Sequence, residues 1–451
     1  MDNEGPSAAP PRDAAARERA DLGLSGPLRR SLLNAGWLLG GKGVGGIFSL
    51  IYLGLAARTL GVDAFGAFAL ILAFGQAVAG VVQFQTAEVL IRFGARHLAE
   101  ERIDRFLRIV SFSALLDLGS AAACAAFAIA AVTFLGGPIG LSAADQLRAA
   151  VFGASFLFSL RGTPIGILRL LDRFDVAALS ETVLPACRLI AALLCFFFAP
   201  TVDGFLAAWA CAELVTTVTL WLAALRQLAK RNIEFGALPP GVAGVASENA
   251  GLWRFAWFTN FASTITFLWQ QAPTLAVGWG AGPAAAGGFR VAQQLAQSLS
   301  KPVVSLSRAA FPEFANLAVR HGGGAVVKFS NKLSSLAAIA GLGAVAVVAA
   351  FGKQLLSIIF GPEFAFADTL LLLLTIAAAI DFWGFGQEPA LLALGRPGVV
   401  LAARAGLGVA FLALLVALLI SFGATGAAAA AIVGRLSYRI ATTWLLRRYG
   451  A

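Results

Sequence analysis

Long apolar stretches, separated by short polar segments, run along this chain from Ser31 almost to its end. Each stretch holds roughly 20 residues or more, which is the length that an α-helix needs to cross a bilayer. The pattern therefore predicts an all-α polytopic membrane protein with about 12 transmembrane helices. The expected helices cover residues 31–57, 65–91, 108–135, 149–170, 176–199, 204–228, 253–279, 285–311, 333–352, 367–391, 398–421 and 424–446.

The basic residues between these stretches alternate from one side of the membrane to the other. Clusters such as Arg92, Arg96 and Arg102 occupy the even-numbered gaps, whereas the odd-numbered gaps hold single cations such as Arg58 and Lys353. Because cytoplasmic loops of membrane proteins collect lysine and arginine, this alternation predicts that both chain termini are cytoplasmic. A missed helix would invert the pattern in all later gaps, so the alternation also supports an even number of helices.

Short sequence matches relate the first six expected helices to the last six. Gly-Ala-Phe at 66–68 recurs as Gly-Gly-Phe at 287–289, and each motif has a glutamine eight positions after its phenylalanine. Leu-Asp-Arg-Phe-Asp-Val at 171–176 recurs as Leu-Gly-Arg-Pro-Gly-Val at 394–399. The two offsets, 221 and 223 positions, are nearly equal. Because six crossings return the chain to its starting side, we expect two parallel lobes around a central cavity.

The widest polar loop, at 229–252, contains Pro239-Pro240-Gly241 and separates the two halves. The first residues are rich in alanine, proline and charged side chains, a composition typical of disorder. We therefore expect four regions along the chain. They are a disordered cytoplasmic N-terminus at 1–28, an N-lobe with helices 1–6 at 29–228, a cytoplasmic linker loop at 229–252, and a C-lobe with helices 7–12 at 253–451.

Composition supports the membrane assignment and limits the classes of partner. Hydrophobic residues make up 59% of the chain, charged residues 13%, and the mean hydropathy is +0.81. The net charge of +10 is explained by basic cytoplasmic loops, so we expect no nucleic-acid partner. The four cysteines and two histidines form no cluster in the sequence, so we expect neither a metal nor another cofactor.

The helix expected at 285–311 carries a continuous polar stripe. Its polar residues recur at spacings of three and four, which places them on one helix face over roughly 27 Å. A stripe of this length does not face lipid, so we expect it to line a water-filled cavity. Snorkelling of a long side chain to the interface is the alternative explanation for the last residue. The stripe consists of Arg290, Gln294, Gln297, Lys301, Ser305 and Arg308.

Further cations lie inside other apolar stretches. A cation near the middle of a membrane helix costs roughly 2.5–3.5 kcal/mol on insertion scales. A chain that accepts this cost repeatedly is expected to offset it with an anionic ligand or a hydrated cavity. Together with the stripe, these cations give a predicted anion-binding set of Lys42, Arg161, Arg188, Arg290, Gln294, Gln297, Lys301 and Arg404.

Several carboxylates lie in or beside the same stretches, and two roles are open for them. They can neutralise neighbouring cations, or one of them can couple transport to H+ or Na+. Glu181 and Arg188, seven positions apart on one helix face, also fit a structural ion pair. Glu213 and Glu388 are further intramembrane acids. The residues expected to act in ion coupling or gating are Glu88, Asp117, Glu181 and Asp381.

Particular segments resemble those of a known family. They are Ala-Arg-Thr-Leu-Gly at 57–61, Phe-Gly at 65–66, Arg92 at the end of the second helix, and Leu-Leu-Asp-Arg-Phe at 170–174. With the two six-helix halves, they resemble the polysaccharide transporter family. Its members are lipid-linked oligosaccharide flippases of the MATE-like multidrug/oligosaccharidyl-lipid/polysaccharide superfamily, known as MOP. The resemblance covers nearly the whole chain after residue 30.

This resemblance implies a MATE-like fold and a transport activity. Two helical lobes would surround a cavity that opens alternately to either side of the bacterial inner membrane. The substrate would be an O-antigen or exopolysaccharide repeat unit on undecaprenyl pyrophosphate, exported from the cytoplasmic to the periplasmic leaflet. The protein would work as a monomer among membrane lipids, and its intramembrane cations would bind the pyrophosphate or acidic sugars.

Two other functions fit parts of the sequence. A MATE-type multidrug or cation antiporter would share the fold, but it would need an acidic cavity, whereas arginine and lysine dominate the expected cavity faces. A membrane polysaccharide polymerase or ligase would need reactive groups on the periplasmic side. The odd-numbered loops are short and nearly uncharged, so they offer little for that chemistry. We therefore expect a secondary transporter rather than an enzyme.

Overall fold

The computed structural model describes residues 27–171, 174–233 and 242–450. Helices joined by short turns make up these residues, and none of them forms a strand. Side chains are described throughout these ranges except at 27–42, 174–181, 300–312, 315 and 319.

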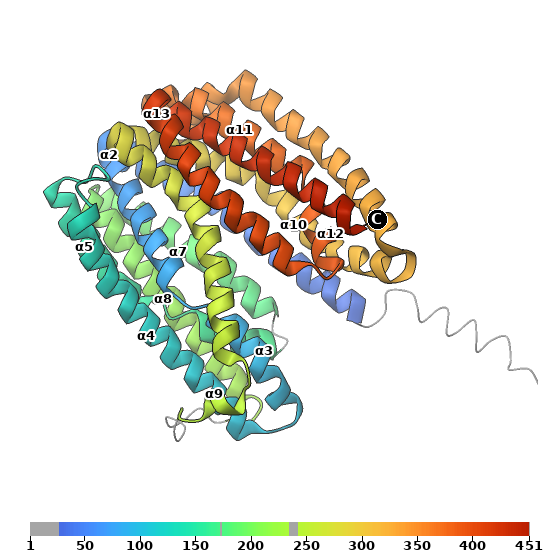
Figure 1. Ribbon diagram of the computed structural model, residues 1–451. Coiled ribbons are helices and arrows are strands. Elements are labelled where there is room, and N and C mark those ends of the chain that lie inside the picture. The colour runs from blue at the N-terminus through green and yellow to red at the C-terminus, as the bar shows by residue number, and fades with distance from the viewer. Residues whose placement is uncertain (1–26, 172–173, 234–241, 451) are drawn as a thin grey trace, which may run out of the picture.

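The elements are arranged in chain order as a series of long helices and short helical fragments (Figure 1). They are α2 (Pro27–Val82), α3 (Thr86–Ala99), α4 (Ile103–Leu135), α5 (Ala143–Ala154), the 3-10 helix η1 (Ser155–Phe158), α6 (Gly162–Leu170), α7 (Phe174–Phe198), α8 (Val202–Ala229), α9 (Val245–Glu248), α10 (Leu252–Ile359), the 3-10 helix η2 (Pro362–Ala367), α11 (Asp368–Trp383), α12 (Gln387–Ala393) and α13 (Pro397–Gly450).

Three of the long helices are interrupted by glycines with positive φ. Gly61 breaks α2 at φ 70°, Gly282 and Gly322 break α10, and Gly423 breaks α13. Glycine adopts this backbone conformation at no steric cost, which explains how the chain turns between helices without a loop. Gly61 and Gly282 are 221 positions apart, the offset of the sequence repeat. The two halves therefore turn at equivalent glycines.

Three of the expected spans are broken into shorter helices. The span expected at 65–91 stops between α2 and α3, the span at 149–170 stops between η1 and α6, and the span at 367–391 stops between α11 and α12. Each break leaves helix ends with free backbone donors and acceptors inside an apolar region, where they need internal partners. Polar side chains of neighbouring helices therefore gather at these breaks.

We call α2–α8 the N-lobe and α10–α13 the C-lobe. Their helices converge at one end of the molecule and diverge toward the end that carries α9, α12 and the C-terminus (Figure 1). The buried core follows this shape. One large cluster draws on both lobes, for example at Phe65, Phe289 and Phe364, and the two largest of the smaller clusters each lie at one lobe. One joins N-lobe helices with α9 and the first turns of α10, and the other belongs to the C-lobe.

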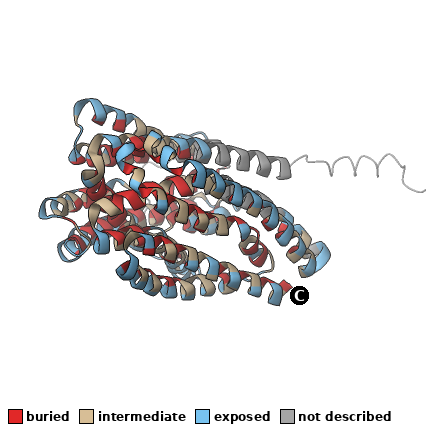
Figure 2. Cartoon of the chain, turned by 90° about the horizontal axis from the view of Figure 1, so that it is seen from above, coloured by how far each residue is buried: buried red, intermediate tan, exposed pale blue. Residues whose placement is uncertain are grey.

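Apolar side chains cover the outer surface of the helices. Phe134 and Phe198, for example, are 79% and 82% exposed, and buried residues lie toward the middle of the molecule (Figure 2). Among the described residues, seven helical segments are long and apolar enough to cross a membrane. The prediction of an all-α polytopic membrane protein is confirmed. The count of 12 helices and the lobe boundaries at 229 and 252 stay predictions.

Candidate functional site

Glu213, on α8, lies between two arginines from different elements of the N-lobe. Arg188, on α7, donates a hydrogen bond to Glu213 Oε1 at 2.8 Å, and the guanidinium of Arg161, directly before α6, lies 3.4 Å from Oε2. The side chains of Arg188 and Glu213 are only 15% and 14% exposed. In such surroundings each charge depends on its partner, because removing one leaves the other poorly solvated.

Two aromatic side chains hold Arg188 in place. Its guanidinium lies 5.1 Å from the centre of the Trp209 ring and donates to the Tyr52 hydroxyl at 3.5 Å. Tyr52 and Trp209 meet edge to face with ring centres 4.8 Å apart. The ring face carries partial negative charge, so this contact stabilises the cation. Tyr52 comes from α2 and Trp209 from α8, so two N-lobe helices besides α7 fix this arginine.

Arg290, on α10, reaches both lobes. It donates to Gln271 Oε1 of the C-lobe at 3.2 Å and to Gln76 Oε1 of the N-lobe at 3.5 Å. No carboxylate lies within ion-pair distance of Arg290 among the side chains that the structure describes, and its Nε has no hydrogen-bond partner there. The charge of Arg188 is near enough to act on it electrostatically. Among the described side chains, Arg290 is thus a partly buried cation held by neutral groups.

Arg161, Arg188, Arg290 and Glu213 form what we call the arginine cluster. Three cations and one carboxylate leave two positive charges, with amide and phenol groups around them. Gln294 and Gln297 lie further along α10 and are partly buried. The side chains of Lys42 and Lys301 lie outside the described residues, as does that of Glu181. Their predicted roles stay predictions.

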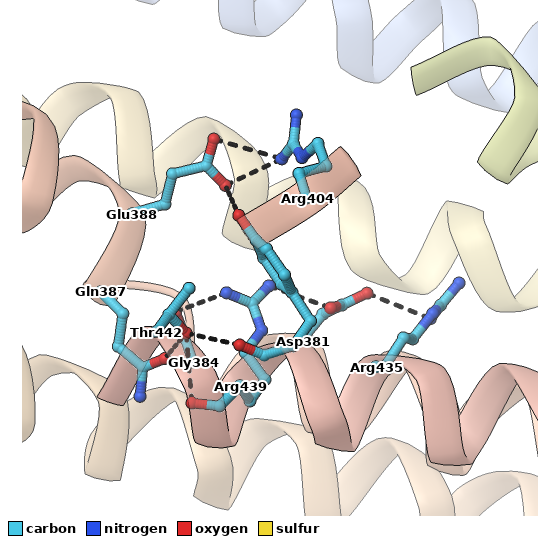
Figure 3. Close-up of polar contacts among 9 residues, drawn as sticks. Asp381, Gly384, Gln387, Glu388, Arg404, Arg435, Arg439 and Thr442 are labelled. Atoms are coloured by element: carbon cyan, nitrogen blue, oxygen red, sulfur yellow. Dashed lines mark hydrogen bonds and ion pairs between the residues drawn. The ribbon is translucent and has the colours of Figure 1, made fainter. Parts of the chain in front are cut away.

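A second group of charges, the C-lobe network, surrounds the break between α11 and α12 (Figure 3). Asp381 accepts from Arg439 at 2.9 Å and lies 3.1 Å from the guanidinium of Arg435. Arg439 also donates to the Gly384 carbonyl at 2.9 Å, which satisfies a backbone acceptor freed by the break. Asp381, predicted to act in coupling or gating, is therefore shared by two arginines of α13.

Arg404 belongs to the same network. It donates to both oxygens of Glu388, at 3.1 and 2.9 Å, and Tyr438 donates to Glu388 Oε2 at 3.4 Å (Figure 3). These contacts lie within the C-lobe, whereas the contacts of Arg161 and Arg188 lie within the N-lobe. Arg404 has a carboxylate of its own, so its charge is more fully balanced than that of Arg290.

The remaining predicted acids have different surroundings. Glu88 is exposed and lies 3.8 Å from Arg169. Asp117, on α4, is buried and accepts from the Thr86 hydroxyl at 2.5 Å and from the Thr163 hydroxyl and backbone N–H at 2.7 and 2.8 Å. Thr86 begins α3 and Thr163 lies in the first turn of α6, so Asp117 binds the starts of two half-helices.

Sequence reasoning missed several partners in both groups. They include Trp209, Arg435 and Arg439. The spacing of Arg435 and Arg439, four apart on one helix face, is a signal that could have drawn attention to them. No group of three or more metal-ligating side chains occurs within the described ranges.

Comparison with known proteins places the chain among membrane proteins of polysaccharide synthesis. Residues 31–318 match the family described as "Polysaccharide biosynthesis protein". The chain is 29% identical over 346 residues to inner membrane protein YghQ of Escherichia coli strain K12, across 77% of this chain and 97% of YghQ. These matches support a multi-pass protein of the inner membrane.

Solved structures show the same fold. Lipid II flippase MurJ, in an inward closed conformation, matches with a TM-score of 0.71 and 12% identity over 89% of this chain and 86% of its own. An inward-facing multidrug resistance MATE family transporter of the MOP superfamily matches with a TM-score of 0.62 and 15% identity. The match covers 96% of this chain and 97% of the transporter. A MOP superfamily transporter from Pyrococcus furiosus matches with a TM-score of 0.60 and 15% identity, over 92% of this chain and 95% of its own. That transporter is described by the reverse polarity of its binding pocket.

Proposed function

The chain belongs to the polysaccharide biosynthesis protein family, and from this premise we propose that it is a flippase for oligosaccharide repeat units linked to undecaprenyl pyrophosphate. Family and fold make it a MOP-type membrane flippase or transporter. In the proposed cycle, the two lobes open alternately to the cytoplasmic and periplasmic sides. The sugar head group and pyrophosphate pass between them while the polyprenyl chain stays in lipid.

The positive charge of the arginine cluster is the observation that supports this substrate. Arg161 and Arg188 share Glu213, and Arg290 has no described carboxylate partner, so two positive charges remain unbalanced among the described side chains. A pyrophosphate that links a lipid to a sugar carries about two negative charges. Charge-assisted hydrogen bonds from guanidinium groups replace the water that such an anion loses on entering a membrane protein. The cluster and the pyrophosphate are therefore complementary in sign and in magnitude.

The position of Arg290 supports a role in the conformational cycle. Its two acceptors, Gln76 and Gln271, come from different lobes and are neutral. A pyrophosphate would bind Arg290 more strongly than either amide does, because its oxygens are charged. Binding would then change the contacts that join the lobes. A ligand shifts a conformational equilibrium only through such differential contacts.

The direction of transport and its driving force are further parts of the proposal. In the proposed orientation, the basic loops and both termini lie on the cytoplasmic side, and the substrate moves outward. The chain has no phosphate-binding loop for ATP in its sequence, so we propose that transport is driven by a gradient of H+ or Na+, by the membrane potential or by removal of product. Glu88, Asp117, Glu181 and Asp381 stay the proposed residues for coupling or gating, and the protein acts as a monomer.

A multidrug or cation antiporter is the second function compatible with the fold. Such a transporter needs surplus negative charge where its substrate binds. In the C-lobe network, Asp381 and Glu388 face three arginines, so this group also carries surplus positive charge. Both charged groups therefore favour an anionic substrate. A polysaccharide polymerase or ligase receives no support from a described group of reactive side chains.

Binding measurements in detergent test the proposed substrate class. We expect the purified protein to bind undecaprenyl pyrophosphate at least tenfold more tightly than undecaprenol, because only the former offers charged oxygens. Arg290→Gln should weaken binding of the pyrophosphate by about tenfold or more, since a hydrogen bond to a charged group contributes about 1.5–3 kcal/mol. Equal affinity for the two lipids, or unchanged affinity in the variant, would contradict the proposal.

A further inference from the structure

A small cavity lies where α3 meets the beginning of α10. It has a volume of about 350 Å³ and is lined by Arg92, Ala250, Gly251, Arg254, Phe255 and Phe258. The guanidinium of Arg92 stacks over the Phe255 ring at 4.4 Å from its centre, and Phe255 also meets Phe93, 5.9 Å between ring centres. The aromatic contacts hold Arg92 against one wall, and Arg254 lies on the helix that forms the other.

The two arginines of this cavity differ from Arg96 and Arg102 in having no ion pair among the described residues. Arg96 and Arg102 both pair with Glu100, at 2.9 and 3.0 Å. For Arg92 and Arg254, no carboxylate lies within ion-pair distance among the residues that the structure describes. Glu100 thus balances Arg96 and Arg102, whereas Arg92 and Arg254 face one cavity without a described carboxylate partner.

The helix that contributes Arg254 adds to the positive character of the cavity. Gly251 and Ala250 line the cavity and directly precede the first turn of α10, which begins at Leu252. Backbone N–H groups at the start of a long helix point outward and carry partial positive charge. An anion in the cavity would therefore face two guanidinium groups and a helix N-terminus.

The surface beside the cavity is apolar and aromatic. Trp257, Phe258 and Phe261, on the next turns of α10, are 59%, 51% and 57% exposed. Tryptophan at the end of a membrane helix is typical of the interface between lipid head groups and acyl chains. Phe258 belongs both to the cavity lining and to this exposed face. The cavity thus opens beside a surface that suits hydrocarbon chains.

We infer that this cavity binds the phosphate head group of an anionic membrane phospholipid. Arg92 and Arg254 bind the phosphate, and the acyl chains follow Trp257, Phe258 and Phe261 into the membrane. A free inorganic phosphate would use the two arginines but not the aromatic face. The inference does not depend on the proposed transport substrate, because it uses none of the residues of the arginine cluster.

Lipid titrations of the delipidated protein in detergent test this site. The probes are phosphatidylglycerol, which is anionic, and phosphatidylcholine, which has no net charge, with binding read by native mass spectrometry. Wild-type protein should bind phosphatidylglycerol about tenfold more tightly, and millimolar inorganic phosphate should not displace it. Equal binding of the two lipids would overturn the charge recognition, and displacement by inorganic phosphate would overturn the lipid assignment.

Matched variants separate this cavity from the general basic surface. Arg92→Gln combined with Arg254→Gln should reduce the affinity for phosphatidylglycerol by about tenfold or more. The control combines Arg105→Gln with Arg226→Gln, which removes the same charge from two exposed arginines outside the cavity lining. The control should stay within about twofold of wild type. Equal losses in both double variants would overturn the site.

The single variant Arg254→Gln covers the case in which loss of Arg92 disturbs packing against Phe255. Arg254 is exposed, so its replacement leaves the aromatic contacts intact. We expect this variant to keep the thermal stability of the lipid-free wild type and to lose part of the affinity for phosphatidylglycerol. Unchanged lipid affinity in a stable Arg254→Gln protein would contradict the inference.

Discussion

At the scale of single residues, Glu213 controls the charge balance of the arginine cluster. It is the described carboxylate within ion-pair distance of both Arg161 and Arg188, and it lies on α8. Two arginines on one carboxylate are stabilised less fully than two separate pairs. The surplus positive charge gives the cluster its capacity to bind an anion, and Glu213 keeps that charge compatible with folding.

Replacing Glu213 with glutamine should therefore destabilise the protein. Removing one partner of a mostly buried ion pair costs about 3–5 kcal/mol, because the remaining charge is left uncompensated. Thermal unfolding in detergent should show a clear decrease in Tm for Glu213→Gln, and the double variant with Arg188→Gln should recover part of it. Glu100→Gln, which alters exposed pairs, is the control. A Tm equal to wild type would show that Glu213 does not balance the cluster.

Arg290 should be required for export although it is not required for folding. It has no described carboxylate partner, so Arg290→Ala leaves no carboxylate uncompensated. In a host that lacks its own flippase, we expect wild type to restore surface polysaccharide and Arg290→Ala or Lys301→Ala to reduce it at least tenfold at equal protein level. Arg105→Ala should behave like wild type. Full export by the Arg290→Ala variant would remove the basis of the proposed mechanism.

The sequence predicted which residue types lie in the membrane but not which ones meet. The sequence identified Arg161, Arg188 and Arg290 as candidate site residues, because a cation in an apolar stretch is costly and must be offset by a ligand, a partner or water. Their common partner was not recognisable, because helical spacing fixes a residue's face only within its own helix. Whether α8 presents Glu213 to α7 depends on how the two helices are rotated and packed. The same limit applies to Asp381 and its two arginines on α13.

At the scale of elements, Asp117 fixes the positions of two broken helices. It comes from α4 and binds residues that begin α3 and α6. Arg161 occupies the position before α6 without capping it by its side chain. Asp117 therefore supplies, from another helix, the acceptor that a capping residue normally provides. Because Arg161 directly precedes this start, the geometry of the arginine cluster depends on Asp117.

Asp117→Ala should lower the stability of the protein more than Asp117→Asn does. Alanine leaves the N–H of Thr163 and two hydroxyl groups without their buried acceptor, and each unsatisfied group costs about 1–3 kcal/mol. Asparagine keeps one carbonyl oxygen that can accept from Thr163. Thermal unfolding should give the order wild type, Asp117→Asn, Asp117→Ala, from highest to lowest Tm. The same Tm for both variants would contradict the capping role.

The sequence predicted where helices lie better than it predicted where they break. The hydrophobic runs predict the positions of most helical spans. The turns at Gly61 and Gly282 fall in polar or glycine-rich segments, so the sequence also indicates where those neighbouring spans are separated. The breaks before α3 and α12 were not predicted, and Pro164, in the first turn of α6, indicates only a kink near the break before α6. At these points neighbouring helices satisfy the backbone, as Asp117 does for Thr163 and Arg439 does for Gly384. Such tertiary partners cannot be read from one apolar run.

At the scale of the whole molecule, small residues and a cap hold the lobes together at their converged end. A Cβ atom on Gly287 would lie 3.0 Å from the Cα of Gly66, so these equivalent glycines of the two halves pack closely. Nearby, Arg58 of α2 donates to the carbonyls of Ser357 and Ile359 at 3.2 and 3.3 Å. This cation satisfies acceptors at the C-terminal end of a helix segment.

Gly66→Val should force the lobes apart at this end. The added side chain would overlap the backbone of Pro283, which cannot move without moving its helix. Spin labels placed on the two lobes near the converged end should report longer distances in the variant than in wild type. Gly119→Val is the matched control, because a Cβ there meets no atom within 4 Å. Identical distance distributions in all three proteins would contradict the close contact between the lobes.

The most direct test of the account is transport by the purified protein. Proteoliposomes would contain a fluorescent undecaprenyl-pyrophosphate-linked oligosaccharide, and a membrane-impermeant quencher would report how much of it reaches the outer leaflet. The account predicts that wild type accelerates this transfer and that Arg290→Gln, reconstituted in equal amount, does not. Transfer at the wild-type rate by Arg290→Gln, or no acceleration by wild type when an ion gradient is present, would contradict it.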